Sequence, residues 1–546
     1  MKKSWWGMFL GVAFLLAAAG CGGGGGGGGG SSDGFTVGGT VSGLTEGSSI
    51  VLTLNGANDL TVAGDPDGIV TFAFPNELKT GDAYAVTVQT PPAGVGHFWS
   101  VANASGTIAG ASVTDVRVNG QLDGTFGENL DGIVTSNGAA GFAGADIGRA
   151  MAIDGDGNIL VVGESERASG NSDMTIWRYD ATGSLDVSFG DGGTATYNGD
   201  ENGDDIGYAI ALDGSGNILV AGMIDDGDMA LWRYTPDGDP DLTFGGGDGF
   251  ASYEDLDPSY GSEGMSVLTD ASGRILVAGS RWDGEDTDMV IWRYAESGAI
   301  DLTFGTGGIA VYYSGLGSLS GDFVGNSLAL ANPADENSAI LVAGTVSSGT
   351  TARMAVWKYT PSGTLDNLFG GYDGITDGVL VYSGAAGSNH AGFSITLAGS
   401  DLLVAGYVRN ASSLADMAIW RFTGTGGSLV STFGTAGVVT HDSAAGGNGD
   451  DQGFFITFDD GNILVTGKSQ NAADGYAMAI WKYTGNGARI SSFGLNGVLV
   501  DNSAAGGDYL AAGTSLAIDA EGRILVTGCS ANTANDLDMV IWRYFP

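Results

Sequence analysis

Carboxylates are the side chains that this chain could use for chemistry in large numbers. Residues 198–205 (NGDENGDD) and 254–257 (EDLD) are dense in them, and residues 154–158 (DGDGN) alternate oxygen ligands as calcium sites do. The weak metal candidates are Asp154, Asp156, Asn158, Asp204 and Asp205. The equivalent turn at 213–217 reads DGSGN, and no closing glutamate stands at a calcium-loop spacing. A hairpin turn on a solvated acidic surface is therefore the competing interpretation, and we expect no cofactor other than calcium.

Other catalytic signals are few. The chain has three histidines (His97, His390, His441) and two cysteines, too few for a disulfide framework. It lacks a Gly-x-Ser-x-Gly elbow, a His-Glu-x-x-His motif and a phosphate-binding loop. Cys529 ends an apolar strand without a neighbouring histidine and is expected to be packed. An enzyme is not excluded, but a binding protein is favoured.

The charge of the chain excludes one class of partner. The 546 residues carry a net charge of −43, with only 20 basic residues. Two of these, Lys2 and Lys3, precede an apolar stretch, so the mature chain would carry 18 − 63 = −45. Such a surface repels phosphate backbones, which makes nucleic-acid binding unfavourable.

One short stretch organises the chain. Residues 289–294 (MVIWRY) recur with small changes, and their tryptophans lie 55 to 65 residues apart. The tryptophans are Trp177, Trp232, Trp292, Trp357, Trp420, Trp481 and Trp542. Arginine follows in most copies, as Arg178, Arg233, Arg293 and Arg543 among others. Regular placement on a strand indicates a core role for these residues. Each buried cation needs a partner; the aspartate of the following Leu-Asp motif would supply it, and Arg543 would use Asp123.

Each repeat contains four predicted strands. In one copy these are residues 207–212, 218–222, 229–234 and 250–253, with an Asp- and Gly-rich turn after the first. Four strands in about 60 residues, seven times over, predict an all-β, seven-bladed β-propeller. The first Phe-Gly precedes any Trp motif, and the last Trp motif has no Phe-Gly after it. Pairing of residues 132–136 with the strand ending at Tyr544 would thus close the ring from both chain ends.

Three recurring motifs carry a family resemblance. They are Ile-Leu-Val-Ala-Gly, a strand ending in Arg-Tyr, and Leu-Asp-x-x-Phe-Gly-x-x-Gly, as at residues 185–193. In this order they resemble the delta-60 repeat of bacterial secreted proteins, over residues 121–546. Val430 and Ile490 depart from the motif where other copies have Asp. The resemblance implies a repeat architecture and no particular activity.

The N-terminal part reads as an export and anchoring region. Residues 1–20 have a basic start and an apolar core too short to span a membrane comfortably. The sequence before Cys21 resembles a bacterial lipobox, which implies lipidation of Cys21. Residues 21–34 contain a Gly run and would be a flexible tether. Residues 35–120 show five alternating strands, predict a small β-sandwich and resemble Ig-like modules of bacterial surface lipoproteins.

Loop length identifies the face expected to carry function. The connection from the third to the fourth strand is nearly constant, whereas the connection from Phe-Gly to the next first strand varies. Variable loops on a rigid scaffold usually carry binding. We therefore expect a lipid-anchored binding or scaffold protein of the bacterial cell envelope, at the outer membrane or cell surface, that recognises a protein, glycan or cation there. The alternative is a propeller hydrolase or lyase acting on an extracellular glycan or lactone.

Overall fold

The computed structural model describes residues 34–545 apart from short gaps. The gaps are residues 43, 45–47, 65–68, 91–96, 124, 130, 200–202, 226, 254–260, 314–318, 371–376, 383, 385–388, 413, 473–474, 492, 495 and 503. The predicted leader, Cys21 and the Gly-rich tether lie outside the described residues. The described part contains 36 strands and no helix, so it also contains no helix able to cross a membrane.

The N-terminal strands form two sheets around one core. Their bounds are β1 (Val37–Ser42), β2 (Ser49–Leu54), β3 (Asn58–Ala63), β4 (Ile69–Ala73), β5 (Ala83–Thr90), β6 (His97–Ala102), β7 (Ser105–Thr107) and β8 (Val113–Asp123). One sheet has the order β3-β2-β5-β7, and β4-β1-β8-β6 pair in the other. Val41, Leu52 and Val116 from both sheets share a buried cluster. The five predicted strands are present, and β3, β6 and β7 were missed because they are short or carry polar residues on both faces.

The repeat region is built from strands that take one of four positions. First strands are β10 (Asp146–Ile153), β14 (Ile206–Leu212), β18 (Ser262–Thr269), β22 (Asp322–Leu330), β26 (His390–Ala398), β30 (Gly446–Asp459) and β34 (Gly506–Ile518). Second strands are β11 (Ile159–Glu166), β15 (Ile218–Ile224), β19 (Ile275–Trp282), β23 (Ile340–Ser348), β27 (Asp401–Arg409), β31 (Asn462–Asn471) and β35 (Ile524–Asn532). Third strands are β12 (Ser172–Tyr179), β16 (Asp228–Tyr234), β20 (Thr287–Tyr294), β24 (Thr351–Tyr359), β28 (Ala415–Thr423), β32 (Tyr476–Thr484) and β36 (Leu537–Tyr544). Fourth strands are β13 (Thr194–Tyr197), β17 (Phe250–Tyr253), β21 (Ile309–Tyr312), β25 (Val379–Val381), β29 (Val438–His441), β33 (Val498–Asp501) and β9 (Ile133–Ser136).

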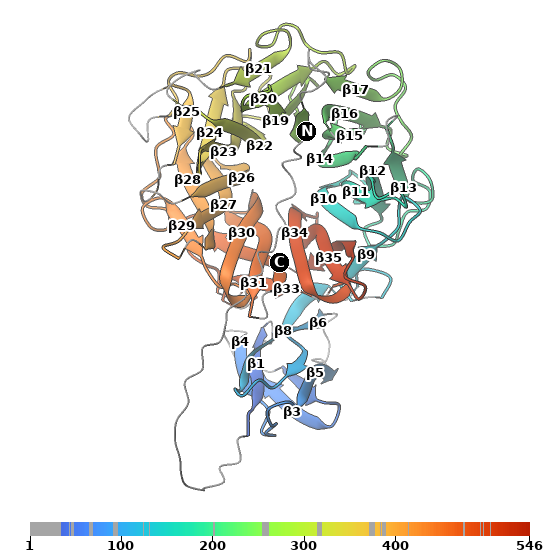
Figure 1. Cartoon of the computed structure of the whole chain (residues 1–546), viewed down its shortest axis with the longest axis vertical. Coiled ribbons are helices and arrows are strands. Elements are labelled where there is room, and N and C mark those ends of the chain that lie inside the picture. Colours follow the sequence, from blue (N-terminus) through green and yellow to red (C-terminus); the bar gives the residue numbers. More distant parts are fainter. Residues whose placement is uncertain are drawn as a thin grey trace.

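Each set of four strands is an antiparallel sheet, here called a unit. The first unit has the order β10-β11-β12-β13, and the next four follow the same order. Figure 1 shows the units arranged around a centre, with first strands such as β10, β14, β22, β26 and β30 innermost and fourth strands outermost. The predicted strands of the second unit agree with β14 to β17 within two residues. The four-stranded sheets therefore have the organisation of a β-propeller repeat.

Apolar side chains join neighbouring units. Trp232 of the second unit packs in one buried cluster with Val162 and Phe189 of the first unit. Each repeated tryptophan is at most 1% exposed. The second strands are buried on both faces, as their unbroken apolar sequences predict. The repeated Trp motif thus forms the core between units.

The two ends of the repeat region pair with each other. β9 is antiparallel to β36, with Ile133 opposite Trp542 and Ser136 opposite Met539. Leu122, near the end of β8, also pairs with Tyr544. β8 itself continues past residue 120, so the predicted domain boundary falls inside a strand that enters the ring. The expected pairing of the early strand with the last one is therefore present.

Candidate ligand-binding site

The predicted calcium loop is a hairpin turn held by its own hydrogen bonds. Asp154 Oδ1 accepts the backbone N–H groups of Asp156 and Asn158, each at 2.9 Å. Asp154 Oδ2 accepts the Asn158 side-chain amide at 2.8 Å. Asp213 and Asn217 repeat this arrangement in the second unit. Both carboxylate oxygens of Asp154 therefore accept hydrogen bonds from within the turn itself.

The acidic connection into the second unit is fixed in a similar way. Asp204 Oδ1 accepts the N–H of Ser172 at 2.9 Å, and Asp205 accepts those of Gly199 and Asp225 at 2.6 and 3.1 Å. Asp205 is buried, and this burial raises its pKa to about 6. The rest of this stretch, residues 200–202, and the acidic residues 254–257 lie outside the described residues. The described carboxylates here hold two variable connections together.

One hollow on this variable-loop face is acidic. It measures about 410 Å³ and is lined by Arg281, Asp283, Glu285, Asp286, Asp288 and Tyr313. Asp283 accepts the N–H groups of the next acidic residues, and Asp288 Oδ2 lies 3.3 Å from Arg281 Nη2. Within the described part of the chain, no three His, Cys, Asp or Glu side chains gather as a metal ion would need. Calcium binding stays a prediction.

Two of the three histidines, His390 and His441, and the second cysteine are packed. His390 is fully buried and its ring lies 5.1 Å from that of Tyr382. His441 Nδ1 accepts a hydrogen bond from Trp481 Nε1 at 2.7 Å, and burial lowers the pKa of His441 to about 4. Burial raises the pKa of Cys529 to about 11, so its thiol stays protonated at neutral pH. These groups lack the setting of a nucleophile–base pair.

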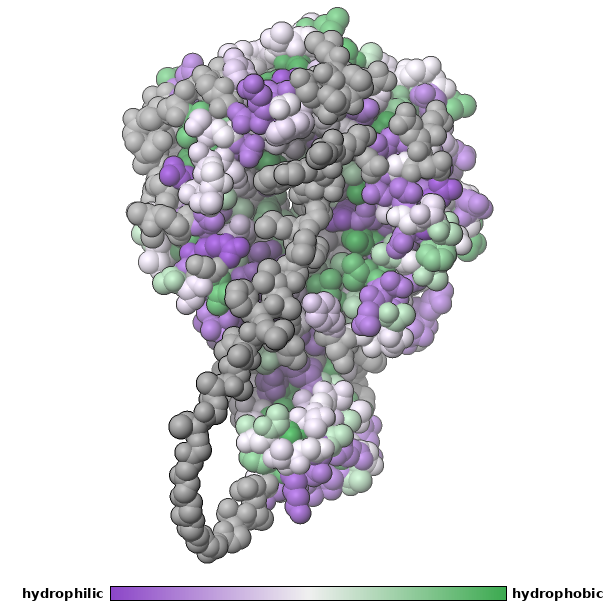
Figure 2. Space-filling model, in the orientation of Figure 1, coloured by the Kyte–Doolittle hydropathy of each residue, from purple (hydrophilic) through white to green (hydrophobic). Residues whose placement is uncertain are grey.

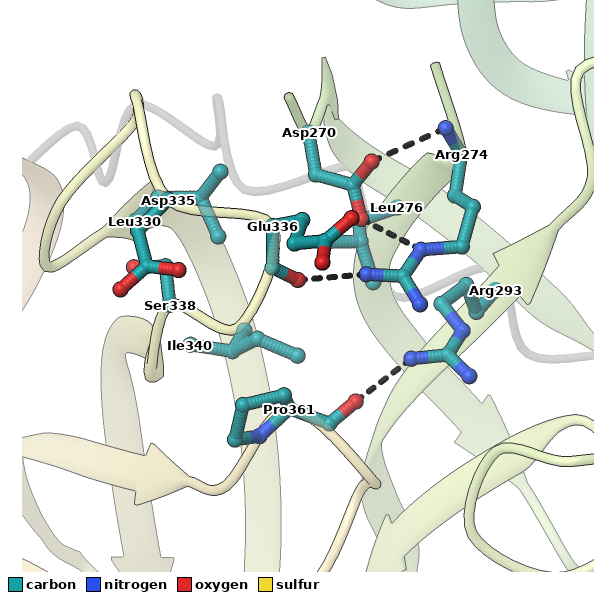
Figure 3. Close-up of a pocket in the computed structure, with 10 residues that line it drawn as sticks. All are labelled: Asp270, Arg274, Leu276, Arg293, Leu330, Asp335, Glu336, Ser338, Ile340 and Pro361. Carbon is teal, nitrogen blue, oxygen red and sulfur yellow. Dashed lines mark hydrogen bonds and ion pairs between the residues drawn. The ribbon is translucent and has the colours of Figure 1, made fainter. Parts of the chain in front are cut away.

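The opposite face carries the ion pairs of the repeated arginines. Arg293 Nε donates to Asp301 Oδ2 at 2.8 Å, and its Nη1 donates to the Pro361 carbonyl of the next unit at 2.5 Å. Figure 3 shows Arg293 and Arg274 at a cavity of about 10 Å³, which has room for a single water molecule. Arg178, Arg233 and Lys358 pair in the same way with the aspartate three residues before the next Phe-Gly, namely Asp186, Asp241 and Asp366. These cations are therefore engaged by groups of the protein itself.

A backbone irregularity gives each unit one distinctive inner position. The register between first and second strands shifts after a glycine of the first strand, such as Gly148 or Gly207. The facing glycine of the second strand has no space for a side chain, because a Cβ on Gly163 would lie 1.8 Å from the Ile147 carbonyl oxygen. A bulge of this kind re-aims the extra residue. Every unit therefore presents one bulged residue on its innermost strand.

The residues after these glycines differ from unit to unit, whereas the surrounding repeat is nearly constant. On the first strands they are Arg149, Tyr208, Met265, Asn326, Phe393, Phe454 and Thr514. On the second strands they are Glu164, Met223, Ser280, Thr345, Tyr407, Lys468 and Cys529. We call these residues the inner wall. They lie at the end of the first strand that meets the variable connections, which is the face predicted to bind.

Aromatic rings and a cation occupy the inner wall of the fifth and sixth units. The ring of Phe393 lies 5.6 Å from that of Phe454 and 5.8 Å from that of Tyr407. Lys468 Nζ lies 5.8 Å from the centre of the Phe454 ring and 4.5 Å from that of Tyr476. Burial lowers the pKa of Lys468. We call Phe393, Tyr407, Phe454 and Lys468 the aromatic arc. Figure 2 shows hydrophobic residues towards the inner part of the repeat region.

An ion pair and a tyrosine occupy part of the inner wall of the first two units. Arg149 forms an ion pair with Glu164, and its guanidinium lies 6.0 Å from the centre of the Tyr208 ring. The charge of Glu263, on the residue before the bulge glycine of the third unit, acts on Tyr208. Burial is the main cause of the raised pKa of Cys529, and the charges of Arg149, Glu164 and Lys468 also act on that thiol.

The sequence contained a signal for these residues that motif searching missed. Aligning the repeats on their invariant glycines isolates the variable position after each one. We had instead predicted the binding face from the variable length of the connections, which include the acidic loops. The structure adds two facts: each of these residues lies in a bulge, and the first strands are innermost. Together they bring the residues after the glycines of neighbouring units close to one another.

Comparison with known families agrees with the repeat. Residues 155–189, 214–244, 271–304 and 339–369 match the model of a domain of unknown function, DUF5122, described as a β-propeller. The expectation of a propeller-like repeat is thus supported at this level. No curated protein matches the chain.

Solved structures show only distant likeness. The polysaccharide lyase Uly1 is 11% identical with a TM-score of 0.43, over 75% of this chain and 92% of that one. A PL25 ulvan lyase is 12% identical with a TM-score of 0.41, over 73% and 94%. A DUF4623 family protein from Bacteroides eggerthii is 11% identical with a TM-score of 0.31, over 91% and 98%.

Proposed function

We propose that the repeat region is a seven-bladed β-propeller closed by both chain ends. The support is that the last unit repeats contacts made inside the chain. Gly190 N donates to Asp237 O of the next unit at 2.8 Å, and Gly127 N donates to Thr182 O of the first unit at 2.8 Å. Phe126 and Val134 share a buried cluster with Trp177 of the first unit and Ile541 of the last. Pairing of β9 with β36 gives the last unit the fourth strand that its own repeat lacks, so the edge of β36 is covered.

The proposed placement of the protein is the bacterial cell envelope. The leader-like residues 1–20, the lipobox-like stretch before Cys21 and the Gly run support an acyl anchor followed by a flexible tether. The two N-terminal sheets and their common core support a β-sandwich module that separates the propeller from the membrane. The proposed anchor lies on the outer membrane or cell surface.

The proposed function is binding of an anionic glycan at the inner wall. The observation that carries it is the aromatic arc. Its three rings and Lys468 occupy the positions after the glycines, which vary from unit to unit in an otherwise constant repeat. Aromatic faces pack against the apolar faces of sugar rings, and a cation attracts carboxylate or sulfate groups. The chain has only 20 basic residues, yet two of them, Arg149 and Lys468, lie on the inner wall. A scaffold protein would not need basic residues there.

A binding screen with matched variants tests the proposal. Acidic and neutral glycans would be titrated into the full mature chain by calorimetry. Phe454→Ala should weaken binding of the acidic glycan by about 2- to 13-fold, since one aromatic contact contributes about 0.5–1.5 kcal/mol. Phe142→Ala is the control, because Phe142 is 43% exposed on a variable connection and is not an inner-wall residue.

A second control separates binding from stability. Arg293→Met removes an ion pair of the opposite face, so it should lower the melting temperature and leave glycan affinity unchanged. Loss of binding in Phe142→Ala with full binding in Phe454→Ala would place the site on the loops instead. Failure of every glycan to bind the intact chain would refute the proposed function.

A further inference from the structure

The N-terminal sheets contact the repeat region through a buried arginine. Arg117 of β8 is 8% exposed, and its Nη1 donates a hydrogen bond to the carbonyl of Ala444. A Cβ on Gly446 would lie 3.0 Å from Arg117 Nη2, so the guanidinium also lies close to the start of β30. Figure 1 shows β8 between the N-terminal sheets and the repeat region. Arg117 therefore binds the segment between β29 and β30, residues 442–445, which we call the docked connection.

Two residues of the sixth unit hold the docked connection from its other side. Asp451 Oδ2 accepts the backbone N–H of Ser443 at 2.6 Å. Ser469 Oγ accepts the backbone N–H of Ala445 at 2.8 Å. Asp451 and Ser469 lie opposite each other in the register of β30 and β31, and both are at most 1% exposed. The connection is thus fixed between the N-terminal sheets and the two inner strands of the sixth unit.

The same two strands carry half of the aromatic arc. Phe454 follows Asp451 by three residues on β30, and Lys468 directly precedes Ser469 on β31. Lys468 Nζ lies 5.8 Å from the centre of the Phe454 ring. A bulge, rather than a regular ladder, connects Asp451 to Phe454, because the register of the two strands shifts between them. A displacement of Asp451 and Ser469 would therefore change how the ring and the ammonium group lie relative to each other.

The first unit shows which part of this arrangement belongs to the repeat. Asp146 and Ser165 lie opposite each other there, at the corresponding positions. Asp146 Oδ2 accepts the N–H of Ala139 at 3.4 Å. Ser165 Oγ accepts the N–H of Ala140 at 2.9 Å. The Asp–Ser pair is therefore a feature of the repeat, whereas Arg117 reaches the sixth unit from outside it.

Loss of the Arg117 hydrogen bond should displace the docked connection. The bond to the Ala444 carbonyl is buried, and a buried carbonyl without a donor is unfavourable. The connection would move until water reaches this carbonyl. Asp451 and Ser469 would move with it, because they bind the residues on either side of Ala444.

We propose that Arg117 is a positioning residue for the aromatic arc, so that the N-terminal sheets belong to the ligand-binding unit and are more than a spacer. This inference rests on the proposed function, because the aromatic arc is the site on which Arg117 acts. Arg117 does not contact the glycan. It acts through the docked connection and through the Asp–Ser pair that joins β30 to β31.

The test measures glycan affinity and melting temperature separately on the full mature chain. Polygalacturonate and chondroitin sulfate are the acidic probes, titrated by calorimetry. Arg117→Met should weaken binding of the acidic probe by about 2- to 30-fold, the range expected for a change that acts through a contiguous network. Arg293→Met is the matched control, because Arg293 also donates to a backbone carbonyl but lies on the opposite face. It should leave the affinity unchanged.

A double-mutant cycle distinguishes positioning from a general loss of structure. If Arg117 acts through Phe454, Arg117→Met should weaken binding less in the Phe454→Ala background than in the wild-type chain. Arg117→Lys retains a donor for the Ala444 carbonyl and should recover part of the affinity. Ser469→Ala breaks the other side of the link with a small change in volume. It should weaken binding as well, which keeps the test decisive if Arg117→Met does not fold.

Three outcomes would overturn the positioning role. Full affinity in Arg117→Met and Ser469→Ala, with loss of binding in Phe454→Ala, would overturn it and leave glycan binding at the arc standing. Strictly additive losses in the cycle would also overturn it. Absence of binding of both probes to the intact chain would overturn it and, if every other acidic glycan fails to bind, the proposed function with it.

Discussion

Arg543 Nη2 lies 2.8 Å from Asp123 Oδ2, and this ion pair joins the last strand of the chain to the end of β8. The Arg543 guanidinium also packs over the ring of Phe126 at 4.2 Å and donates to the Ala181 carbonyl of the first unit. Arg293 makes the equivalent three contacts with Asp301, Phe304 and Pro361 within and between internal units. One interaction pattern thus serves both the internal units and the contact between the two ends of the repeat region.

The first prediction concerns this ion pair. Both side chains are at most 2% exposed, so Asp123→Asn should lower the free energy of unfolding by about 3–5 kcal/mol, since it leaves a buried cation unpaired. Asp186→Asn removes the more exposed partner of Arg178 and should cost about 1 kcal/mol or less. Denaturant unfolding of both variants measures the difference. Equal losses of unfolding free energy in the two variants would contradict the larger contribution of the Asp123–Arg543 pair.

The second prediction concerns the segment that pairs the chain ends. Deleting residues 121–137 removes Asp123, Phe126 and β9, and exposes the edge of β36. Thermal unfolding should then occur at a much lower temperature than in the intact chain. Deleting residues 35–119 removes a core of its own and should have the smaller effect on the ring. An unchanged unfolding transition after the first deletion would contradict closure by both ends.

The third prediction concerns pH. Burial raises the pKa of Asp146 and Asp205 to about 6 and that of Asp451 to about 7, above the unfolded value near 4. The folded chain therefore binds these protons more tightly, and stability should rise as the pH falls from 8 to about 5.

The opposite sign applies at lower pH. Burial alone would raise the pKa of Asp123, but hydrogen bonds from Thr125 and the Arg543 charge hold it below its usual value. Stability from such groups is lost as the pH falls below about 4. Melting temperatures between pH 3 and 8 should thus pass through a maximum. Asp451→Asn should reduce the rise between pH 8 and 5, and an unchanged rise would contradict the assignment to Asp451.

The fourth prediction concerns the anchor. The mature protein should begin at an acylated Cys21, and mass spectrometry of the purified N-terminus would detect the lipid. Cys21→Ala should release the protein from membranes after fractionation, while Cys529→Ala should not, because that thiol is buried in the ring. An intact leader or an unmodified Cys21 in the membrane fraction would refute lipidation.

The sequence by itself determined the repeat and its strands. The period of the Trp motif, the alternation of apolar residues and the Asp–Gly turns are local signals, and local hydrogen bonding realises them in β14 to β17. The phase of the Phe-Gly motifs also predicted the pairing of β9 with β36 and the partnership of Arg543 with Asp123, because every repeat copies the same contacts.

Only the tertiary structure decided where the candidate site lies. Phe393 and Phe454 of the aromatic arc are far apart in the chain, and no motif links them. Their rings meet because the bulge after each glycine re-aims one side chain on strands that the packing of the tryptophans places innermost. In the described part of the acidic connection 198–205, Asp204 and Asp205 instead bind backbone N–H groups, since a connection that leaves a sheet must satisfy its own polar atoms.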